Sequence, residues 1–142
     1  MELTGFVENL VYEPTQTDSP GLDLTVGSIH RITEPGRVDF GGGELEAAET
    51  DALETEKRNP ADDYGWWELP GGVYLLEYNE SLSGPEDVRL VVQTRQAVRT
   101  RGAFHPTVHL TADQSLGAVP LTVSEGGIKI KENARLSTLL SG

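Results

Sequence analysis

The apolar residues of this chain recur mostly at every second position or in short runs of β-branched residues, which is the pattern of β-strands. Turn-forming stretches rich in Gly and Pro separate these runs, among them Glu-Gly-Gly at 125–127, which predicts a hairpin turn. The predicted strands cover residues 22–26, 28–33, 73–79, 88–94, 107–110, 119–123, 128–131 and 135–140. Many short strands at close spacing predict an all-β fold, either a barrel or a jelly-roll-like sandwich.

Residues 34–63 break this pattern. They contain ten carboxylates, three consecutive glycines at 41–43 and few large apolar side chains, so we expect an exposed excursion from the core. The sequence allows a helix of useful length only within residues 43–58. Its apolar positions would be Leu45, Ala47, Ala48, Ala52 and Leu53. The prediction is therefore a single domain over residues 1–142 with at most one short helix.

Composition narrows the class of protein. The 142 residues include no cysteine, which excludes disulfides, thiolate catalysis and cysteine-ligated zinc. No apolar run approaches the roughly 18 residues that span a bilayer, so we expect a cytoplasmic protein with no membrane partner. The 23 acidic residues outnumber the 11 Lys and Arg and give a formal net charge of −12. Such a surface repels nucleic acid, and with only three lysines it indicates either adaptation to high salt or an ordinary acidic protein.

Residues 88–112 contain no Asp or Glu, yet they include four arginines and two histidines. Guanidinium groups match phosphate oxygens, so this stretch is a candidate anion site; the alternative is that its arginines pair with carboxylates elsewhere. His105 and His109 do not predict a metal site, because a spacing of four on a strand separates the side chains by roughly 13 Å. Trp66 and Trp67 would point to opposite faces of a strand, so at most one could stack on a base, and we expect them to pack beneath the acidic excursion or to be buried between subunits.

Four short segments, in this order and spacing, resemble the trimeric dUTPase and dCTP deaminase superfamily of jelly-roll nucleotide enzymes. Pro-Gly-Leu-Asp-Leu at 20–24 is similar to its first motif. Leu-Pro-Gly-Gly at 69–72, followed by a strand and Glu80, is similar to the hairpin of proline-glycine, strand and glutamate that precedes its phosphate site. Residues 95–102 stand where the superfamily has Arg-Ser-Ser-x-x-Arg-x-Gly, and residues 133–139 resemble Gly-x-Arg-Ile-x-Gln-Leu. The resemblance covers about residues 20–140 and implies a distorted β-barrel of the dUTPase type.

The resemblance also implies a site. Its substrate-binding positions fall on Asp23, Arg95, Gln96, Ala97, Arg99 and Arg135. Gln96 and Ala97 replace two serines that grip the triphosphate in the family, and Thr100 replaces its second arginine, for which Arg99 or Arg101 could compensate. If this segment is a strand, however, a shift of one residue points to the other face. The alternative for Arg95 is a surface ion pair.

Asp113 is the candidate catalytic residue. It stands 18 residues after Arg95, where the resemblance implies the aspartate that orients a water for attack on the α-phosphate. A carboxylate can accept a proton from water while Mg²⁺ neutralises the phosphates. The loop after Asp113 is shorter than in the family, and a different gap placement puts Thr111 at this position instead. The other interpretation of Asp113 is a turn-stabilising residue.

These residues lead to two hypotheses about function. One is hydrolysis of dUTP, or a related deoxynucleoside triphosphate, to dUMP and pyrophosphate by a homotrimer with Mg²⁺. The other is a degenerate member that binds nucleotide or serves as a regulatory subunit, since positions 96, 97, 122 and 138 all depart from the family pattern. Deamination of dCTP is disfavoured, because Thr122 stands where the deaminases have a glutamate that moves protons, and threonine is no base near neutral pH. Pro120 fits that strand only at an edge or a bulge.

Overall fold

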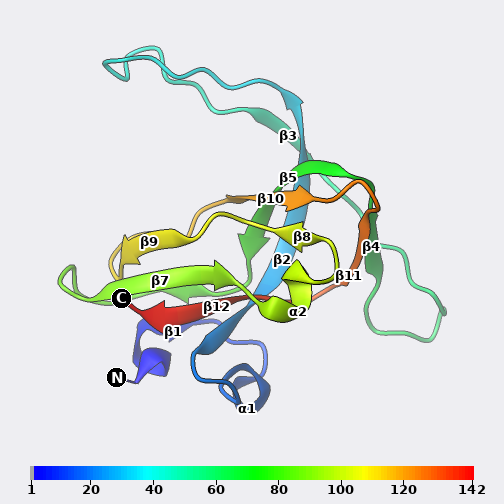
Figure 1. Ribbon diagram of the computed structural model, residues 1–142, viewed down its shortest axis with the longest axis horizontal. Coiled ribbons are helices and arrows are strands. Elements are labelled where there is room, and N and C mark those ends of the chain that lie inside the picture. Colours follow the sequence, from blue (N-terminus) through cyan, green and yellow to red (C-terminus); the bar gives the residue numbers. More distant parts are fainter. Residues whose placement is uncertain (1) are drawn as a thin grey trace.

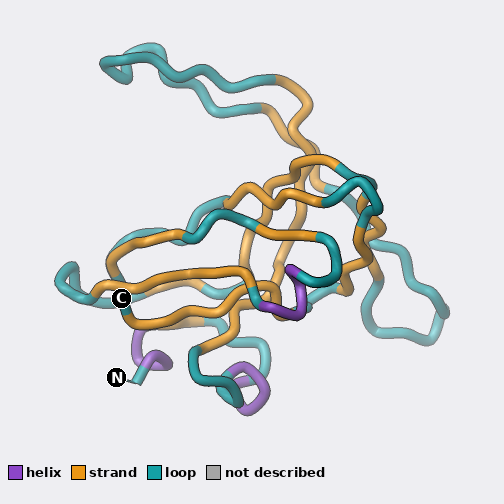
Figure 2. The backbone as a smooth tube through the Cα atoms, viewed as in Figure 1, coloured by secondary structure: helices purple, strands orange, loops and turns teal. Residues whose placement is uncertain are grey.

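A computed structural model describes residues 2–142 and consists mainly of antiparallel β-strands (Figures 1 and 2). The strands are β1 (Val7–Glu8), β2 (Leu22–Glu34), β3 (Glu49–Ala52), β4 (Trp66–Leu69), β5 (Gly72–Tyr78), β6 (Ser81–Leu82), β7 (Arg89–Thr94), β8 (Ala103–Phe104), β9 (Val108–Thr111), β10 (Val119–Val123), β11 (Ile128–Lys131) and β12 (Arg135–Ser141). Each predicted strand is present, with 22–26 and 28–33 joined in β2. The all-β class is confirmed.

The large sheet is organised around β2. Its strand order is β8-β10-β5-β2-β12-β7-β9, with β3 paired to the outer part of β2. The first residues of β2, Leu22 to Thr25, pair with β12, and those from Val26 to Arg31 pair with β5. A register shift between Val26 and Ser28 lets the 13-residue strand change partners, because a bulge bends a strand and increases its twist. The sheet therefore curls into the distorted barrel that the sequence predicts.

Two hydrophobic clusters follow from this bend. One gathers buried residues of β2, β4, β5 and β10, including Ile29, Trp67, Leu76 and Leu121. The other lies between the start of β2 and strands β7, β9 and β12, and Leu24 is at its centre with no exposed surface. Each fully buried side chain of this size contributes roughly 1.5–3 kcal/mol. Strand β2 contributes to both clusters and so connects the two halves of the core.

The helix prediction is wrong. Within residues 43–58 the chain forms β3, which pairs with β2 in an exposed two-stranded ribbon that leaves the barrel (Figure 1). The ribbon buries no apolar face, so its conformation is set by the hydrogen-bonding edge of β2 and not by helix propensity. Helical turns occur elsewhere instead: η1 (Leu3–Phe6), α1 (Glu13–Gln16) and α2 (Gln96–Arg99). There are thus two α-helices of four residues each in the described residues, whereas the sequence predicts at most one short helix. None of the described helices has the length and hydropathy to cross a membrane.

Strand β4 is an element that the predicted strand set lacks. It pairs with β11, and its two tryptophans point to opposite faces as expected from adjacent strand positions. Trp67 is buried and donates its indole N–H to the carbonyl of Leu53 at 3.0 Å. Trp66 faces outward under the guanidinium of Arg58, 3.9 Å from the ring centre. Trp67 thus packs against the second half of the acidic excursion at Leu53, which agrees with the expected packing beneath that segment.

Candidate functional site

Three of the predicted site residues meet in one cluster, which we call the arginine cluster: Asp23, Arg95 and Arg135. Strand β12 lies between β2 and β7, so the first residue of β12 is close to Asp23 of β2 and to Arg95, which directly follows β7. The Asp23 carboxylate has no exposed surface, and its Oδ2 is 3.0 Å from Arg135 Nη1 and 3.5 Å from Arg95 Nε. Its Oδ1 accepts hydrogen bonds from Thr138 Oγ1 at 3.0 Å and Ser19 Oγ at 3.3 Å.

The two guanidinium groups keep a face toward solvent. Their side chains are 24% and 29% exposed. Arg95 donates through Nη1 to the carbonyl of Arg135 at 3.1 Å, and Arg135 donates through Nη1 to the Thr15 carbonyl and to Asp18, both at 3.2 Å. Within residues 2–142 neither Nη2 has a partner, so both groups retain donors for an anion. Asp23 lies beneath them and acts as a positioning residue.

The segment after Arg95 is helical, so the strand geometry considered for it is wrong. Residues Gln96 to Arg99 form α2, whose short length and buried Val98 show that it is held by tertiary packing. Arg95 precedes α2 as its N-cap residue, with an extended backbone, and Arg99 is the last residue of the helix. Gln96, Ala97 and Arg99 are all exposed. Gln96 and Ala97, which depart from the phosphate motif, are thus surface residues that directly follow Arg95.

Asp113 and Thr111 lie together in the turn after β9. The Thr111 hydroxyl donates a hydrogen bond to the Asp113 carboxylate, and the Gln114 side chain accepts one from the Thr111 amide at 2.8 Å. Thr111 pairs with Arg89 at the beginning of β7, whereas Arg95 follows its end. Six steps of extended chain span about 20 Å at roughly 3.3 Å per residue. A single chain therefore does not bring its Asp113 to its own arginine cluster.

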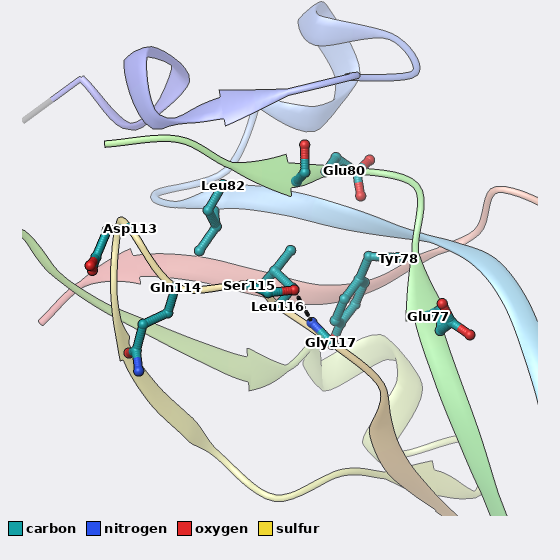
Figure 3. A pocket seen from close by; sticks show the side chains of 10 residues that line it. Glu77, Tyr78, Glu80, Leu82, Asp113, Gln114, Ser115, Leu116 and Gly117 are labelled. Atoms are coloured by element: carbon teal, nitrogen blue, oxygen red, sulfur yellow. Dashed lines mark hydrogen bonds between the residues drawn. The ribbon is translucent and has the colours of Figure 1, made fainter. Parts of the chain in front are cut away.

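A pocket of about 380 Å³ opens beside Asp113 (Figure 3). The loop of residues 113–117 forms one wall, and the segment that includes Glu77, Tyr78 and Leu82 forms the other. The pocket is lined by carboxylates and by no Lys or Arg, so its field repels phosphate. Its chemistry suits a neutral ring, a sugar or a cation.

Glu80 lines the same pocket, but its carboxylate is occupied by hydrogen bonds within the fold. It is 4% exposed and accepts hydrogen bonds from the amide and hydroxyl of Thr25 at 2.8 and 2.6 Å and from the Gln16 side chain at 2.8 Å. The side-chain oxygen Oε1 of Gln16 accepts hydrogen bonds from the backbone amides of Val11 and Tyr12, both at 2.8 Å. Glu80 thus fastens the N-terminal segment to β2.

Sequence reasoning missed a buried polar network next to the arginine cluster. His105 Nδ1 is 2.7 Å from the carbonyl of Pro106, which can only accept, so Nδ1 has the proton and Nε2 accepts from the Ser137 hydroxyl at 2.7 Å. Ser137 Oγ in turn lies 2.6 Å from the Tyr78 hydroxyl. Burial lowers the pKa of His105 and raises that of Tyr78 to about 12, so both are neutral near pH 7. Ser137 has no exposed surface and cannot act as a nucleophile toward a ligand.

The strand at the position of the deaminase glutamate has the edge that Pro120 predicts. Thr122 is on β10, partly exposed, and pairs with Val73 and Phe104 on the two neighbouring strands. Pro120 pairs only with Leu75 of β5, because β8 reaches no further than Thr122 and Val123. The missing N–H of Pro120 therefore falls on a free edge, as predicted. Among residues 2–142, no group of three or more His, Asp or Glu could hold a metal ion.

This barrel, with nucleotide-type motifs on β2, α2 and β12, defines a member of the dUTPase and dCTP deaminase superfamily. No family model matches the chain. It is 31% identical over 136 residues to a probable deoxyuridine 5′-triphosphate nucleotidohydrolase of Methanosarcina mazei, a match that covers 94% of this chain and 76% of the relative. A protein of the same description from Archaeoglobus fulgidus is 30% identical over 138 residues, or 96% of this chain and 77% of the relative.

The chain belongs to the deoxyuridine 5′-triphosphate nucleotidohydrolase (dUTPase) family. Its fold also superposes on the crystal structure of 2′-deoxycytidine 5′-triphosphate deaminase from Agrobacterium tumefaciens, with a TM-score of 0.62 and 18% identity. That superposition covers 96% of this chain and 44% of the deaminase chain. The fold and the relatives both support a dUTPase-like protein of nucleotide metabolism.

Proposed function

We propose that this protein binds dUTP, or a closely related deoxynucleoside triphosphate, and hydrolyses it to the monophosphate and pyrophosphate. The observation that supports this most is the arginine cluster, in which buried Asp23 holds Arg95 and Arg135 with free donors toward solvent. A pre-positioned pair of guanidinium groups suits a triphosphate, since each can make bidentate hydrogen bonds to phosphate oxygens. The relatives described as probable dUTPases favour a nucleotide over other anions.

The substrate contacts follow from the surface around this cluster. Arg95 and Arg135 bind phosphate oxygens, and Arg99 adds a third positive charge one helical turn away. The Gln96 amide can donate a hydrogen bond in place of a serine hydroxyl, whereas Ala97 offers no side-chain donor. Binding at this site therefore depends more on arginine and less on hydroxyl groups than the family motif implies.

Hydrolysis requires a second copy of the chain. The length of β7, about 20 Å, separates Asp113 from the arginine cluster of its own chain. In the proposed homotrimer, Asp113 of the partner subunit therefore faces the bound phosphates. There the carboxylate orients a water and accepts its proton as the water attacks the α-phosphate, and pyrophosphate leaves. Mg²⁺ bound together with the nucleotide would neutralise phosphate charge, and the Asp113 carboxylate is an oxygen donor of the kind that Mg²⁺ prefers.

The test is pyrophosphate release from dUTP with Mg²⁺, measured together with the shift in unfolding temperature on nucleotide binding, in molar KCl. A ligand selective for the folded state raises that temperature. Arg95→Ala should weaken binding by about tenfold or more, because it removes a charged partner of the phosphates. Asp113→Asn should retain the thermal shift and lose pyrophosphate release, whereas Thr111→Val should retain both.

The results separate the hypotheses. Release that persists in Asp113→Asn and is lost in Thr111→Val would reassign the catalytic position to Thr111. A thermal shift without release in the wild type would favour the degenerate nucleotide-binding member, which the departures at Gln96, Ala97, Thr122 and Thr138 also favour. The proposal would be overturned if no deoxynucleotide gave either pyrophosphate release or a shift in unfolding temperature.

A further inference from the structure

The ribbon formed by residues 34–52, which we call the acidic arm, extends from the barrel and has a defined conformation (Figure 1). The Arg37 and Glu46 backbones exchange hydrogen bonds of 2.9 and 3.0 Å, and their side chains form an ion pair at 3.0 Å. Asp39 Oδ2 accepts the amides of Gly42 and Glu44 at 3.1 and 3.2 Å and so closes the tip. The arm is therefore a built hairpin that can present side chains in a fixed arrangement.

The tip of the acidic arm displays large apolar side chains to water. Phe40 is fully exposed, Val38 is 89% exposed and Leu45 is 63% exposed. Six carboxylates and a single arginine accompany them between residues 34 and 52. Apolar side chains gathered at an exposed tip mark an interaction surface, and the excess of negative charge disfavours nucleic acid and anionic lipid as its partner.

The outer face of the sheet has a surface of complementary character at its β8 edge. Thr122 pairs with Val73 on one side and with Phe104 on the other, so the three side chains form one row across β5, β10 and β8. Val73 and Phe104 are 53% and 55% exposed. Arg101, close by in the chain, is exposed and forms no ion pair within residues 2–142. We call these four residues the Phe104 row.

We propose that the acidic arm of one chain docks on the Phe104 row of a second copy. Phe40 and Leu45 would cover Val73 and Phe104, and the arm carboxylates would face Arg101. The stretch 88–112, which contains no acidic residue, is the part of this chain whose charge best complements the arm. The acidic arm does not contact the Phe104 row of its own chain, because it leaves the barrel (Figure 1). Its tip at Phe40 is six extended residues from Glu34, a length of about 20 Å.

The absence of cysteine permits a direct test. Phe40→Cys and Phe104→Cys are made in separate chains with different tags, mixed, and oxidised at low and at molar KCl. A disulfide needs Cα atoms within about 7 Å, so a cross-linked pair with twice the 15.4 kDa chain mass reports contact between arm and row. The matched control pairs Phe40→Cys with Tyr64→Cys, because Tyr64 is also an exposed aromatic residue but lies outside the row. The 40–104 product should exceed the 40–64 product by about tenfold or more.

The charge contribution is tested in the same assay. Arg101→Glu should lower the 40–104 yield by about fivefold at low salt, and this effect should shrink in molar KCl, where the Debye length is about 3 Å. Equal yields for the 40–104 and 40–64 pairs, or cross-links that join only the position-40 thiols of two Phe40→Cys chains, would overturn the proposal. Phe40, Phe104 and Tyr64 lie outside the proposed nucleotide site, so pyrophosphate release by the cysteine variants shows separately whether the proposed function stands.

Discussion

At the scale of single residues, the site depends on groups that no ligand would touch. Asp23 is wholly buried, yet it sets the orientation of both Arg95 and Arg135. Removing one partner of a buried charged group typically costs about 3–5 kcal/mol, whereas an exposed pair such as Arg135 with Asp18 contributes about 0–1 kcal/mol. Asp23 of the first family motif thus orients the two arginines in this chain, and its negative charge affects a ligand only through them.

His105 has a similar supporting role, without charge. The imidazole accepts from Ser137 and donates to the Pro106 carbonyl, while its own amide donates to Thr94 Oγ1 at 3.0 Å. Every polar atom of the ring is therefore satisfied in the neutral form. Protonation would put a second donor against the Ser137 hydroxyl and a charge into the core.

This predicts an acid-sensitive fold. Burial lowers the pKa of His105 below its ordinary value of 6.5, so the unfolded chain takes up the proton first as the pH falls. The free energy of unfolding should therefore decrease as the pH drops below about 6.5, by at most about 1.4 kcal/mol per pH unit from this group, until the folded-state pKa is reached. Urea unfolding between about pH 7.5 and 5 measures this slope, which His105→Gln should reduce.

His109→Gln is the matched control, since His109 is exposed on β9 and should leave the slope unchanged. If the slope is the same in the wild type and in His105→Gln, the acid sensitivity arises from other groups.

At the scale of elements, β2 links the two halves of the barrel, and Gly21 determines how closely its start approaches β12. A Cβ at Gly21 would lie 2.5 Å from the carbonyl oxygen of Leu139 and 2.6 Å from a methyl of Thr138. Real Cβ atoms do not approach backbone oxygens so closely, so any side chain there would push β2 away from β12. The glycine of the Pro-Gly-Leu-Asp-Leu motif is therefore required by strand packing.

Gly21→Ala should consequently destabilise the fold by about 1–3 kcal/mol, as is typical of an overpacked position. It should also weaken nucleotide binding, because β2 and β12 hold Asp23 and Arg135. Gly41→Ala is the control, since a Cβ there meets nothing within 4 Å and should change stability by less than about 0.5 kcal/mol. Denaturant unfolding of both variants measures the difference, and equal stabilities would show that β12 can shift at little cost.

The elements also show which parts of the structure the sequence could predict. Strand β10 was predictable because its buried residues Val119, Leu121 and Val123 alternate along the chain, and β5 was predictable as a short apolar run between turn-forming residues. The turn α2 and strand β3 were not, because four residues bury too little surface to leave a periodic pattern, and both are set by neighbours distant in sequence. The arginine cluster followed from motif resemblance, but the Ser137–His105–Tyr78 network joins three separate strands or loops and leaves no local signal.

At the scale of the whole molecule, charge and assembly are linked. Only five of the 23 acidic residues, Asp18, Asp23, Glu46, Glu68 and Glu77, have an ion-pair partner in the described part of the chain. The remainder repel one another, and the same repulsion opposes the approach of a second copy. Salt should therefore favour both the fold and its self-association, which the proposed site between subunits would require.

The resulting prediction is that the unfolding temperature rises steeply between about 0.1 and 1 M KCl, where the Debye length falls from about 10 to 3 Å. A variant with Glu34→Gln, Glu44→Gln, Glu49→Gln and Asp51→Asn should show a smaller rise, because it removes four unpaired charges of the acidic arm without touching the Arg37–Glu46 pair. Sulfate at matched ionic strength separates screening from the general stabilisation by excluded salts, which depends on the anion. A rise that is the same in both proteins, or that appears only with sulfate, would show that self-repulsion is not what limits this fold at low salt.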